Sequence, residues 1–159
     1  MILAVPEPLW APWRLEYIAK ADEQDECIFC APDKKLLVHR GERALALLNK
    51  FPYSSGHLMI APTRHTGDFA SLDSDEASEI HSLAASAMGA LAQEYAPQGF
   101  NLGWNLGRIA GAGIVDHVHL HVVPRWADDM NFMPVLADVR VLPEALEDTR
   151  RKLVAAWPA

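Results

Sequence analysis

Three histidines alternate with aliphatic residues in the segment 117–123, which reads His-Val-His-Leu-His-Val-Val. Successive side chains of an extended strand point to opposite faces, so His117, His119 and His121 would share one face. At a rise of ~3.3 Å per residue, neighbouring imidazoles are ~6.6 Å apart and the outer two are ~13 Å apart. A single histidine on such a strand is most simply a polar surface residue. Three in register fit a polyphosphate chain better than a single metal ion.

A glycine-rich segment, residues 105–116, leads directly into this row and contains Gly107, Gly111 and Gly113. Glycines let backbone N–H groups approach an anion closely because no Cβ stands in the way. A neutral imidazole is a good nucleophile toward phosphorus because its pKa lies close to neutral pH. The two features together indicate cleavage of a phosphoanhydride by attack and release, with water or another acceptor entering in the second step.

The histidine row resembles the H-φ-H-φ-H-φ-φ signature that defines the histidine triad (HIT) superfamily of nucleotide hydrolases and transferases. The resemblance implies that His119, the middle histidine, is the nucleophile and forms a nucleotidyl-histidine intermediate. It implies that His121 holds the bridging oxygen and assists the leaving group, with His117 as the first histidine of the triad. His57, in the sequence Ser-Gly-His-Leu-Met-Ile-Ala-Pro, matches the superfamily's upstream histidine, which lies beside the triad on the neighbouring strand.

Substrate contacts are expected from two asparagines and from the glycine-rich segment. Asn49 matches the superfamily position that usually contacts the nucleotide ribose, although its amide could equally cap a strand end. Asn105 could bind phosphate or pair with the backbone. From the glycine-rich segment we expect Gly111, Gly113 and Ile114 to contact the substrate.

The resemblance extends to one branch of the superfamily, the diadenosine tetraphosphate phosphorylases and fragile-histidine-triad hydrolases. It is carried by the segments 105–113, 122–126 and 129–133, and by an N-terminal segment that includes Leu-Trp-Ala-Pro-Trp-Arg at 9–14. The implied function is cleavage of dinucleoside polyphosphates such as diadenosine tetraphosphate, with water or orthophosphate as the acceptor. Two alternatives remain open: hydrolysis of adenosine phosphoramidates, and a nucleotide-binding signalling protein with slow turnover.

Cys27 and Cys30 are the two cysteines of the chain, and their Cys-x-x-Cys spacing suits half of a zinc site. Several triad proteins and their uridylyltransferase relatives complete such a site with a histidine after the third strand and the first triad histidine. That resemblance implies His65 and His117 as the remaining ligands of a structural zinc, and His117 would then be unavailable for proton transfer. A free buried thiol pair and a redox pair are the alternatives. Mg²⁺ bound to the substrate polyphosphate is a second candidate cofactor.

The elements that must position these residues follow from hydrophobic periodicity and from turn signals. A helix from Asp73 or Ser74 to Tyr95 has capping residues at its start and Pro97 after its end. A short helix can begin at Pro12, and a C-terminal helix is expected at 143–157, with Leu146, Leu153, Val154 and Trp157 toward the body. Strands are expected at 36–39, 43–49, 56–62, 100–106 and 117–124. This order predicts an α+β fold, a five-stranded antiparallel sheet with one long helix and a C-terminal helix.

The 159 residues, half of them hydrophobic, predict one HIT domain with an N-terminal arm (1–26), a core (27–126) and a C-terminal extension (127–159). A net charge of −7 argues against binding to nucleic acid or an anionic membrane. No signal peptide or membrane-spanning run is evident, so we expect a cytoplasmic protein. Trp10 and Trp13 could dock the arm on the body or on a second subunit, or pack at the edge of the core. Triad proteins typically dimerise, which implies a homodimer.

Overall fold

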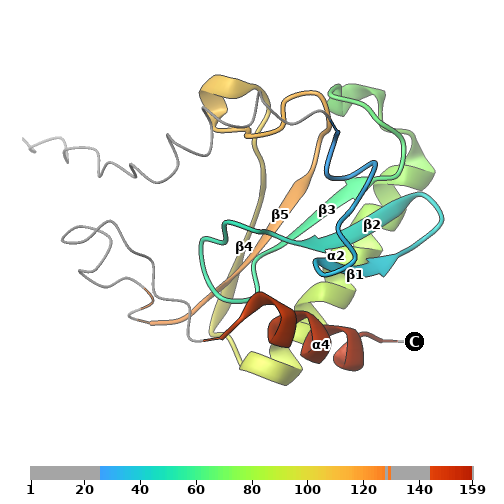
Figure 1. The fold of residues 1–159 in the computed structure, drawn as a ribbon. Helices are drawn as coiled ribbons and strands as arrows, with labels where there is room; N and C mark the ends of the chain where they lie inside the picture. Colours follow the sequence, from blue (N-terminus) through green and yellow to red (C-terminus); the bar gives the residue numbers. More distant parts are fainter. Residues whose placement is uncertain (1–25, 128, 130–143, 159) are drawn as a thin grey trace, which may run out of the picture.

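The computed structural model describes residues 26–127, 129 and 144–158, and these residues form one antiparallel sheet flanked by helices (Figure 1). The spatial order of the strands is β1-β2-β3-β5-β4. The strands are β1 (Leu37–Arg40), β2 (Ala44–Leu48), β3 (Leu58–Pro62), β4 (Gly99–Trp104) and β5 (Leu120–Arg125). The sheet therefore brings β3 and β5, which are far apart in the sequence, side by side, with Met59 opposite His121.

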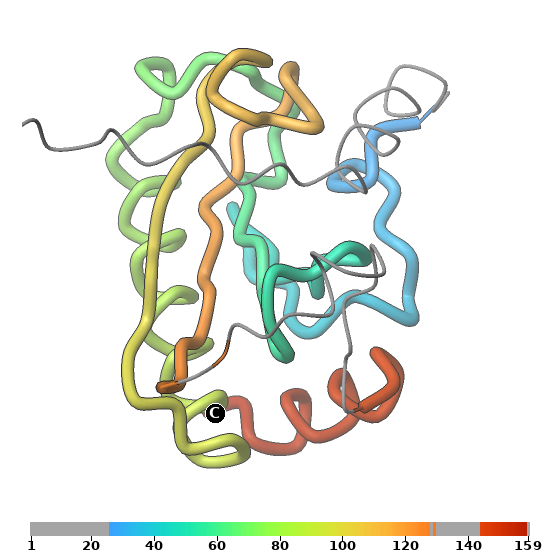
Figure 2. Tube along the Cα trace, turned by 90° about the vertical axis from the view of Figure 1, so that its left-hand side faces the viewer, coloured from blue at the N-terminus to red at the C-terminus, as the bar shows by residue number. Residues whose placement is uncertain are grey.

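Helix α2 (Ser74–Tyr95) covers one face of the sheet, as Figure 2 shows. It begins with a capping box, in which the Asp73 side chain accepts hydrogen bonds from the Asp75 and Glu76 N–H groups and the Glu76 carboxylate accepts one from the Asp73 N–H. Its buried residues recur at helical spacing and pack against the sheet in one hydrophobic core: Ile80, Leu83, Ala84, Ala87, Ala90 and Leu91. The opposite face of β5, which carries His121, is not covered by α2 and lines a cavity.

Helix α4 (Leu146–Ala156) crosses one end of the sheet and packs against α2 and β1 (Figure 2). The Arg150 Nε–H donates to the Leu37 carbonyl at 2.6 Å, and the Trp157 ring stacks on His39. Leu153 is fully buried as expected, but Val154 is 41% exposed, so its assignment to the inner face is wrong. Thr149 is buried instead, and its hydroxyl is satisfied because it donates to the Glu144 carboxylate just before the helix.

The expected α+β architecture is confirmed, with two additional short 3₁₀ helices, η1 (Phe69–Ser71) and η2 (Arg108–Ala110). The long helix begins at Ser74 after an Asp73 cap, as predicted. The fifth strand begins at Leu120, three residues later than expected. The proposed helix at Pro12 and the residues Trp10 and Trp13 lie outside the described residues. None of the helices in the described ranges is long and apolar enough to cross a membrane.

Candidate functional site

The first two histidines of the row lie in the loop that leads into β5, and this loop is hydrogen-bonded to the loop after β3. The Val118 N–H donates to the Thr66 carbonyl at 2.7 Å, so the segment before β5 pairs with the loop after β3 and not with a strand. His117 and His119 therefore precede β5, and only His121 lies within it. The imidazoles nevertheless stay close together, with the ring centres of His119 and His121 4.9 Å apart.

His119 is held in one tautomer by its own backbone. Its Nδ1 lies 2.9 Å from the His117 carbonyl oxygen, which can only accept, so Nδ1 carries the proton. The neutral ring then has its lone pair on Nε2, and no described residue hydrogen-bonds that atom. The ring is 5% exposed and packs against Phe29 at 4.9 Å between ring centres. Burial lowers the pKa of His119, with the His117 carbonyl acting in the opposite direction, so the neutral form is favoured.

His57 and His121 form a second directed hydrogen bond. The Tyr53 N–H donates to His57 Nδ1 at 3.1 Å, which places the proton of neutral His57 on Nε2. That Nε2 lies 2.9 Å from His121 Nδ1, so His57 donates to His121. The proton of neutral His121 is consequently on Nε2. This geometry lets His121 donate a hydrogen bond to a substrate oxygen beside His119.

The two asparagines both reach these histidines. The Asn49 Oδ1 accepts from the Phe51 N–H at 2.9 Å, and its Nδ2 lies 3.4 Å from His57 Nδ1. Asn49 thus closes the turn after β2, as the capping alternative expects, while remaining beside the histidines. The Asn105 side-chain amide lies 3.4 Å from His121 Nε2, and it pairs with an Nε2–H when its oxygen is the atom turned toward the ring.

The glycine-rich segment contains one turn of 3₁₀ helix, η2, bounded by two glycines with positive φ. Gly107 has φ 85° and Gly111 has φ 90°, values that residues with a Cβ rarely adopt. The Gly111 N–H donates to the Arg108 carbonyl, so this N–H group is already used within the loop. Among the described residues, no hydrogen bond engages the N–H groups of Gly113 and Ile114. These two groups, and not the Gly111 N–H, are the ones suited to an anion.

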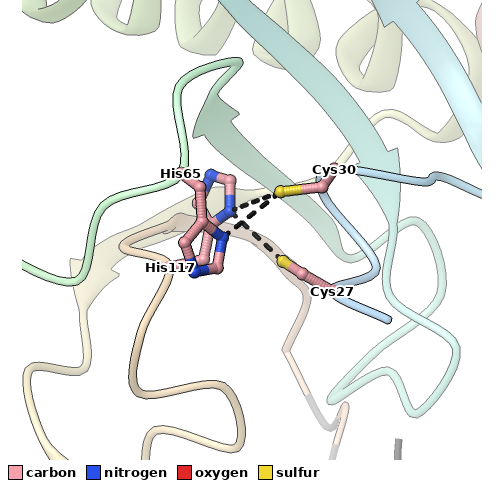
Figure 3. A group of neighbouring side chains, drawn as sticks. All are labelled: Cys27, Cys30, His65 and His117. Atoms are coloured by element: carbon pink, nitrogen blue, oxygen red, sulfur yellow. Dashed lines mark hydrogen bonds between the residues drawn. The ribbon is translucent and has the colours of Figure 1, made fainter. Parts of the chain in front are cut away.

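Cys27, Cys30, His65 and His117 converge from three segments, with their ligand atoms all within 4.8 Å of one another (Figure 3). The Cys27 Sγ lies 3.2 Å from His117 Nδ1, and the Cys30 Sγ lies 3.2 Å from His65 Nδ1 and 3.7 Å from His117 Nδ1. A tetrahedral zinc with Zn–S of about 2.3 Å and Zn–N of about 2.0 Å has S···N edges of about 3.5 Å. The predicted ligand set therefore fits zinc in both donor type and spacing.

The protons of the two histidines are also arranged for metal binding. The His117 Nε2 donates to the Pro62 carbonyl at 2.9 Å, which leaves the Nδ1 lone pair facing the sulfurs. The His65 Nε2 lies 3.7 Å from the Asp116 carboxylate. Burial lowers the pKa of His117, assisted by His65 and His119, and the Pro62 carbonyl opposes it. Burial and the neighbouring Cys27 raise the pKa of the Cys30 thiol, which is the expected effect of gathering thiols without a cation.

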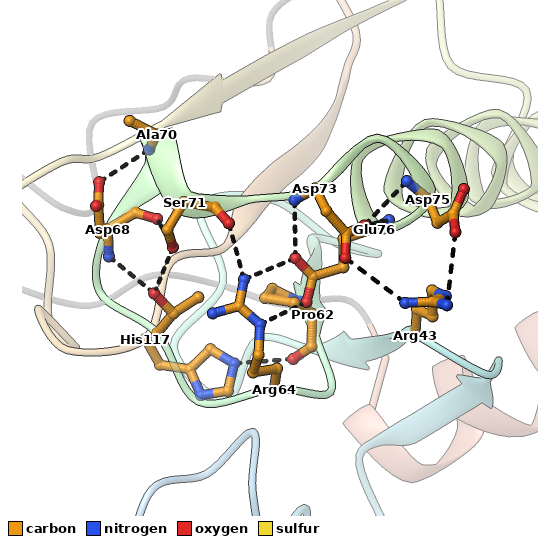
Figure 4. A network of polar contacts seen from close by, with 11 residues as sticks. Arg43, Pro62, Arg64, Asp68, Ala70, Ser71, Asp73, Asp75, Glu76 and His117 are labelled. Atoms are coloured by element: carbon orange, nitrogen blue, oxygen red, sulfur yellow. Dashed lines mark hydrogen bonds and ion pairs between the residues drawn. The ribbon is translucent and has the colours of Figure 1, made fainter.

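A polar network anchors the loop that carries His65 to the start of α2 (Figure 4). The Arg64 guanidinium donates from Nε and Nη2 to the Glu76 carboxylate at 2.8 and 2.7 Å, and from Nη2 to the Ser71 carbonyl at 3.0 Å. Glu76 is 4% exposed. Since Arg64 lies between Pro62 and His65, the helix start fixes the backbone on both sides of it. Sequence reasoning missed this pair, because nothing in the spacing of residues 64 and 76 indicates it.

A cavity of about 490 Å³ lies beside His121, on the sheet face opposite α2. Its lining includes Asn105 next to His121 and, farther along the strands, Asn101 and Arg125. These last two residues were not among the predicted site residues. Arg125 alternates with His121 along β5, and this spacing was the signal that could have identified it.

The comparisons with known proteins agree with this geometry. The HIT domain model matches residues 32–128. An AP-4-A phosphorylase of Mycobacterium tuberculosis is 36% identical over 162 residues, covering 94% of this chain and 83% of the relative. The crystal structure of a Zn-bound histidine triad family protein from Mycobacterium smegmatis superposes with a TM-score of 0.67 and 28% identity, over 82% of this chain and 92% of the other. The crystal structure of a HIT family protein from Bacillus anthracis superposes with a TM-score of 0.60 and 35% identity, over 66% of this chain and 77% of the other.

Proposed function

The chain belongs to the HIT domain family, and from this membership and the site geometry we propose that it cleaves dinucleoside polyphosphates such as diadenosine tetraphosphate. One observation carries the proposal: the His117 carbonyl directs the lone pair of neutral His119 to Nε2, beside the proton that His121 presents. The similarity to an AP-4-A phosphorylase over 94% of the chain supports this substrate class.

In the first step, the His119 Nε2 lone pair forms a bond to the α-phosphorus while the bond to the bridging oxygen breaks. The bonding electrons leave with that oxygen as a phosphate, which is stable as an anion, so complete proton transfer is not required. The His121 Nε2–H hydrogen-bonds the bridging oxygen and stabilises the charge that develops there. The positive charge of the nucleotidyl-imidazole is offset by the Nδ1–H bond to the His117 carbonyl.

In the second step, an oxygen of water or orthophosphate forms a new bond to phosphorus, and the P–N electrons return to Nε2. Water releases its proton to the solvent, whereas orthophosphate attacks through an existing oxyanion. Asn49 is proposed to bind the ribose. Asn105 and the N–H groups of Gly113 and Ile114 are proposed to bind the α-phosphate, and Gly111 to supply the turn that presents them.

We propose that zinc occupies the group formed by Cys27, Cys30, His65 and His117. The S···N distances of 3.2 to 3.7 Å and the Nδ1 lone pair of His117 support it. Bound zinc supplies structure here and not catalysis. It fixes the 27–30 segment, which carries Phe29 against His119, to the loop that enters β5.

We also propose a homodimer formed through β4 and the adjoining part of α2. In the described part of the chain β4 pairs only with β5, leaving one edge open. Leu102 on this strand is 46% exposed and Phe69 45%, and both line an apolar cavity of about 470 Å³ with Trp104. Leu102→Glu should convert a dimer into a monomer by size-exclusion chromatography with light scattering, and Val154→Glu on α4 should not. A monomeric wild-type chain would refute the dimer.

The function is tested by product analysis with diadenosine tetraphosphate labelled in the adenylyl group, with and without orthophosphate. AMP and ATP indicate water as the acceptor, and ADP and ATP indicate orthophosphate. Rapid quenching should trap a labelled adenylyl-protein, and His119→Ala should abolish both the adduct and the turnover while leaving the fold intact. Turnover by His119→Ala within a few-fold of wild type would refute the nucleophile.

A further inference from the structure

The cavity beside His121 follows two strands for some distance from the nucleophile. Along β5 its lining alternates as His121, Val123 and Arg125, and along β4 it includes Asn101 and Gly103. Gly103 pairs with His121 and Asn101 with Val123, so the two strands form one continuous floor. Four residues of strand span ~13 Å, so Arg125 lies at the far end of the cavity from His121.

Among the described residues that line this cavity, Arg125 is the only lysine or arginine. Its guanidinium donates from Nε and Nη2 to the Asp129 carboxylate at 2.5 and 3.0 Å, and from Nη1 to the Asn101 Oδ1 at 2.7 Å. These three bonds fix its plane and, counting partners in the described part of the chain, leave two of its five N–H donors for a ligand. The side chain is 44% exposed, so a ligand in the cavity can reach it.

The reaction geometry requires a place for the leaving group on this side. In an in-line displacement the leaving oxygen departs from the side of phosphorus opposite His119 Nε2. His121 is the residue proposed to contact that oxygen, and the cavity begins at His121. The half of a dinucleoside polyphosphate beyond the bridging oxygen is a long polyanion, and it would extend from His121 toward Arg125.

We propose that this cavity is the subsite for the leaving nucleotide, and that Arg125, held by Asn101 and Asp129, binds its distal phosphates. The inference rests on the proposed function, and it assigns to Arg125 the selection of dinucleoside polyphosphates over substrates with small leaving groups. A guanidinium suits this task because it can hydrogen-bond two phosphate oxygens while another of its edges stays paired.

The test compares two substrates that share the adenylyl group: diadenosine tetraphosphate and adenosine 5′-phosphoramidate, whose leaving group is too small to reach Arg125. Arg125→Gln should lower kcat/KM for diadenosine tetraphosphate roughly 10- to 100-fold, the expected effect of a hydrogen bond to a charged group. The value for the phosphoramidate should stay within about twofold of the wild type. Arg151→Gln, which removes an arginine paired with Asp148 on α4, is the matched control and should change neither.

Asn101→Ala provides a second variant if Arg125→Gln unfolds, because it removes one acceptor and keeps the Arg125–Asp129 pair. It should lower the same kcat/KM selectively, by a smaller factor. An equal loss on both substrates, or no loss on diadenosine tetraphosphate, would overturn the subsite. A wild-type protein that cleaves neither substrate would instead refute the proposed function, so the two failures are distinguishable.

Discussion

Removing the thiolate of Cys27 should reveal how far the proposed zinc site supports the nucleophile, His119. Cys27→Ser takes away the sulfur that lies 3.2 Å from His117 Nδ1, and with it one of four ligands. We expect zinc content to fall from one per chain toward zero, because a three-ligand remainder with exposed Cys30 and His65 binds zinc weakly. His117 then keeps its 2.9 Å bond to the Pro62 carbonyl and its longer contact of 3.7 Å with the Cys30 Sγ.

The size of the catalytic effect follows from the contact that links His117 to the nucleophile. That contact is a single hydrogen bond of 2.9 Å, from His119 Nδ1 to the His117 carbonyl. A hydrogen bond of this kind contributes about 0.5–1.5 kcal/mol, which corresponds to roughly a two- to tenfold change in rate. Cys27→Ser should therefore lower kcat for diadenosine tetraphosphate by this modest factor, whereas His119→Ala should abolish turnover.

The assay combines metal analysis of protein purified without added zinc, circular dichroism, and steady-state kinetics at saturating substrate. Ala31→Ser is the matched control, because it places a hydroxyl in the same turn without removing a ligand. Full zinc content in Cys27→Ser would refute the ligand set. A folded, zinc-free protein with unchanged kcat would refute the coupling, and one with turnover as low as His119→Ala would show that the metal does more than position His117.

Three further predictions concern stability. The Arg64 hydrogen bonds lower the pKa of Glu76 in the folded state, so between the folded and unfolded pKa values the unfolded chain binds more protons. The free energy of unfolding should therefore fall as the pH drops below about 4.5. Glu76→Gln should flatten this pH dependence when the free energy of unfolding is measured by urea titration. Gly56 has φ 79°, and a Cβ there would lie 2.6 Å from Leu91 Cδ2, so Gly56→Ala should cost about 2–5 kcal/mol, and an unchanged denaturation midpoint would contradict this. Ala96 caps α2 with φ 44°, so Ala96→Gly should stabilise the protein by about 0.5–1 kcal/mol, and a lower melting temperature would argue against it.

The sheet and the long helix were predictable because their signals are local. Alternation at β5 and helical spacing in α2 each depend on neighbouring residues, and the Asp73 cap is readable from the sequence. The start of β5 was not predictable, because Val118 bonds to Thr66, a partner 52 positions away. The pairing of Arg64 with Glu76 has the same character, since it depends on how the β3–α2 loop folds back on the helix.

The residues of the candidate site likewise include some that the sequence could predict and some that it could not. The metal ligands could be anticipated because the resemblance supplied their positions, and the structure brings all four together. Asn101 could not, because its relation to His121 depends on the register of β4 with β5, which the sequence does not state. Arg125 lies on the same strand as His121, and the alternation along β5 could have identified it. The exposed side of Val154 was also unpredictable, since Thr149 is buried through a bond to Glu144 that hydrophobic spacing does not reveal.

The sequence presents three equivalent histidines, and the hydrogen bonds make them unequal. Both ring nitrogens of His117 are engaged, Nδ1 with the sulfurs and Nε2 with Pro62, so this ring cannot attack a substrate. His121 accepts a hydrogen bond at Nδ1 from His57, which leaves a donor and not a lone pair on Nε2. Only His119 keeps an Nε2 lone pair that no described residue engages. Exchanging these roles would require moving a proton on a ring whose other nitrogen is already committed, so the assignment of the nucleophile follows from the tautomers as well as from the resemblance.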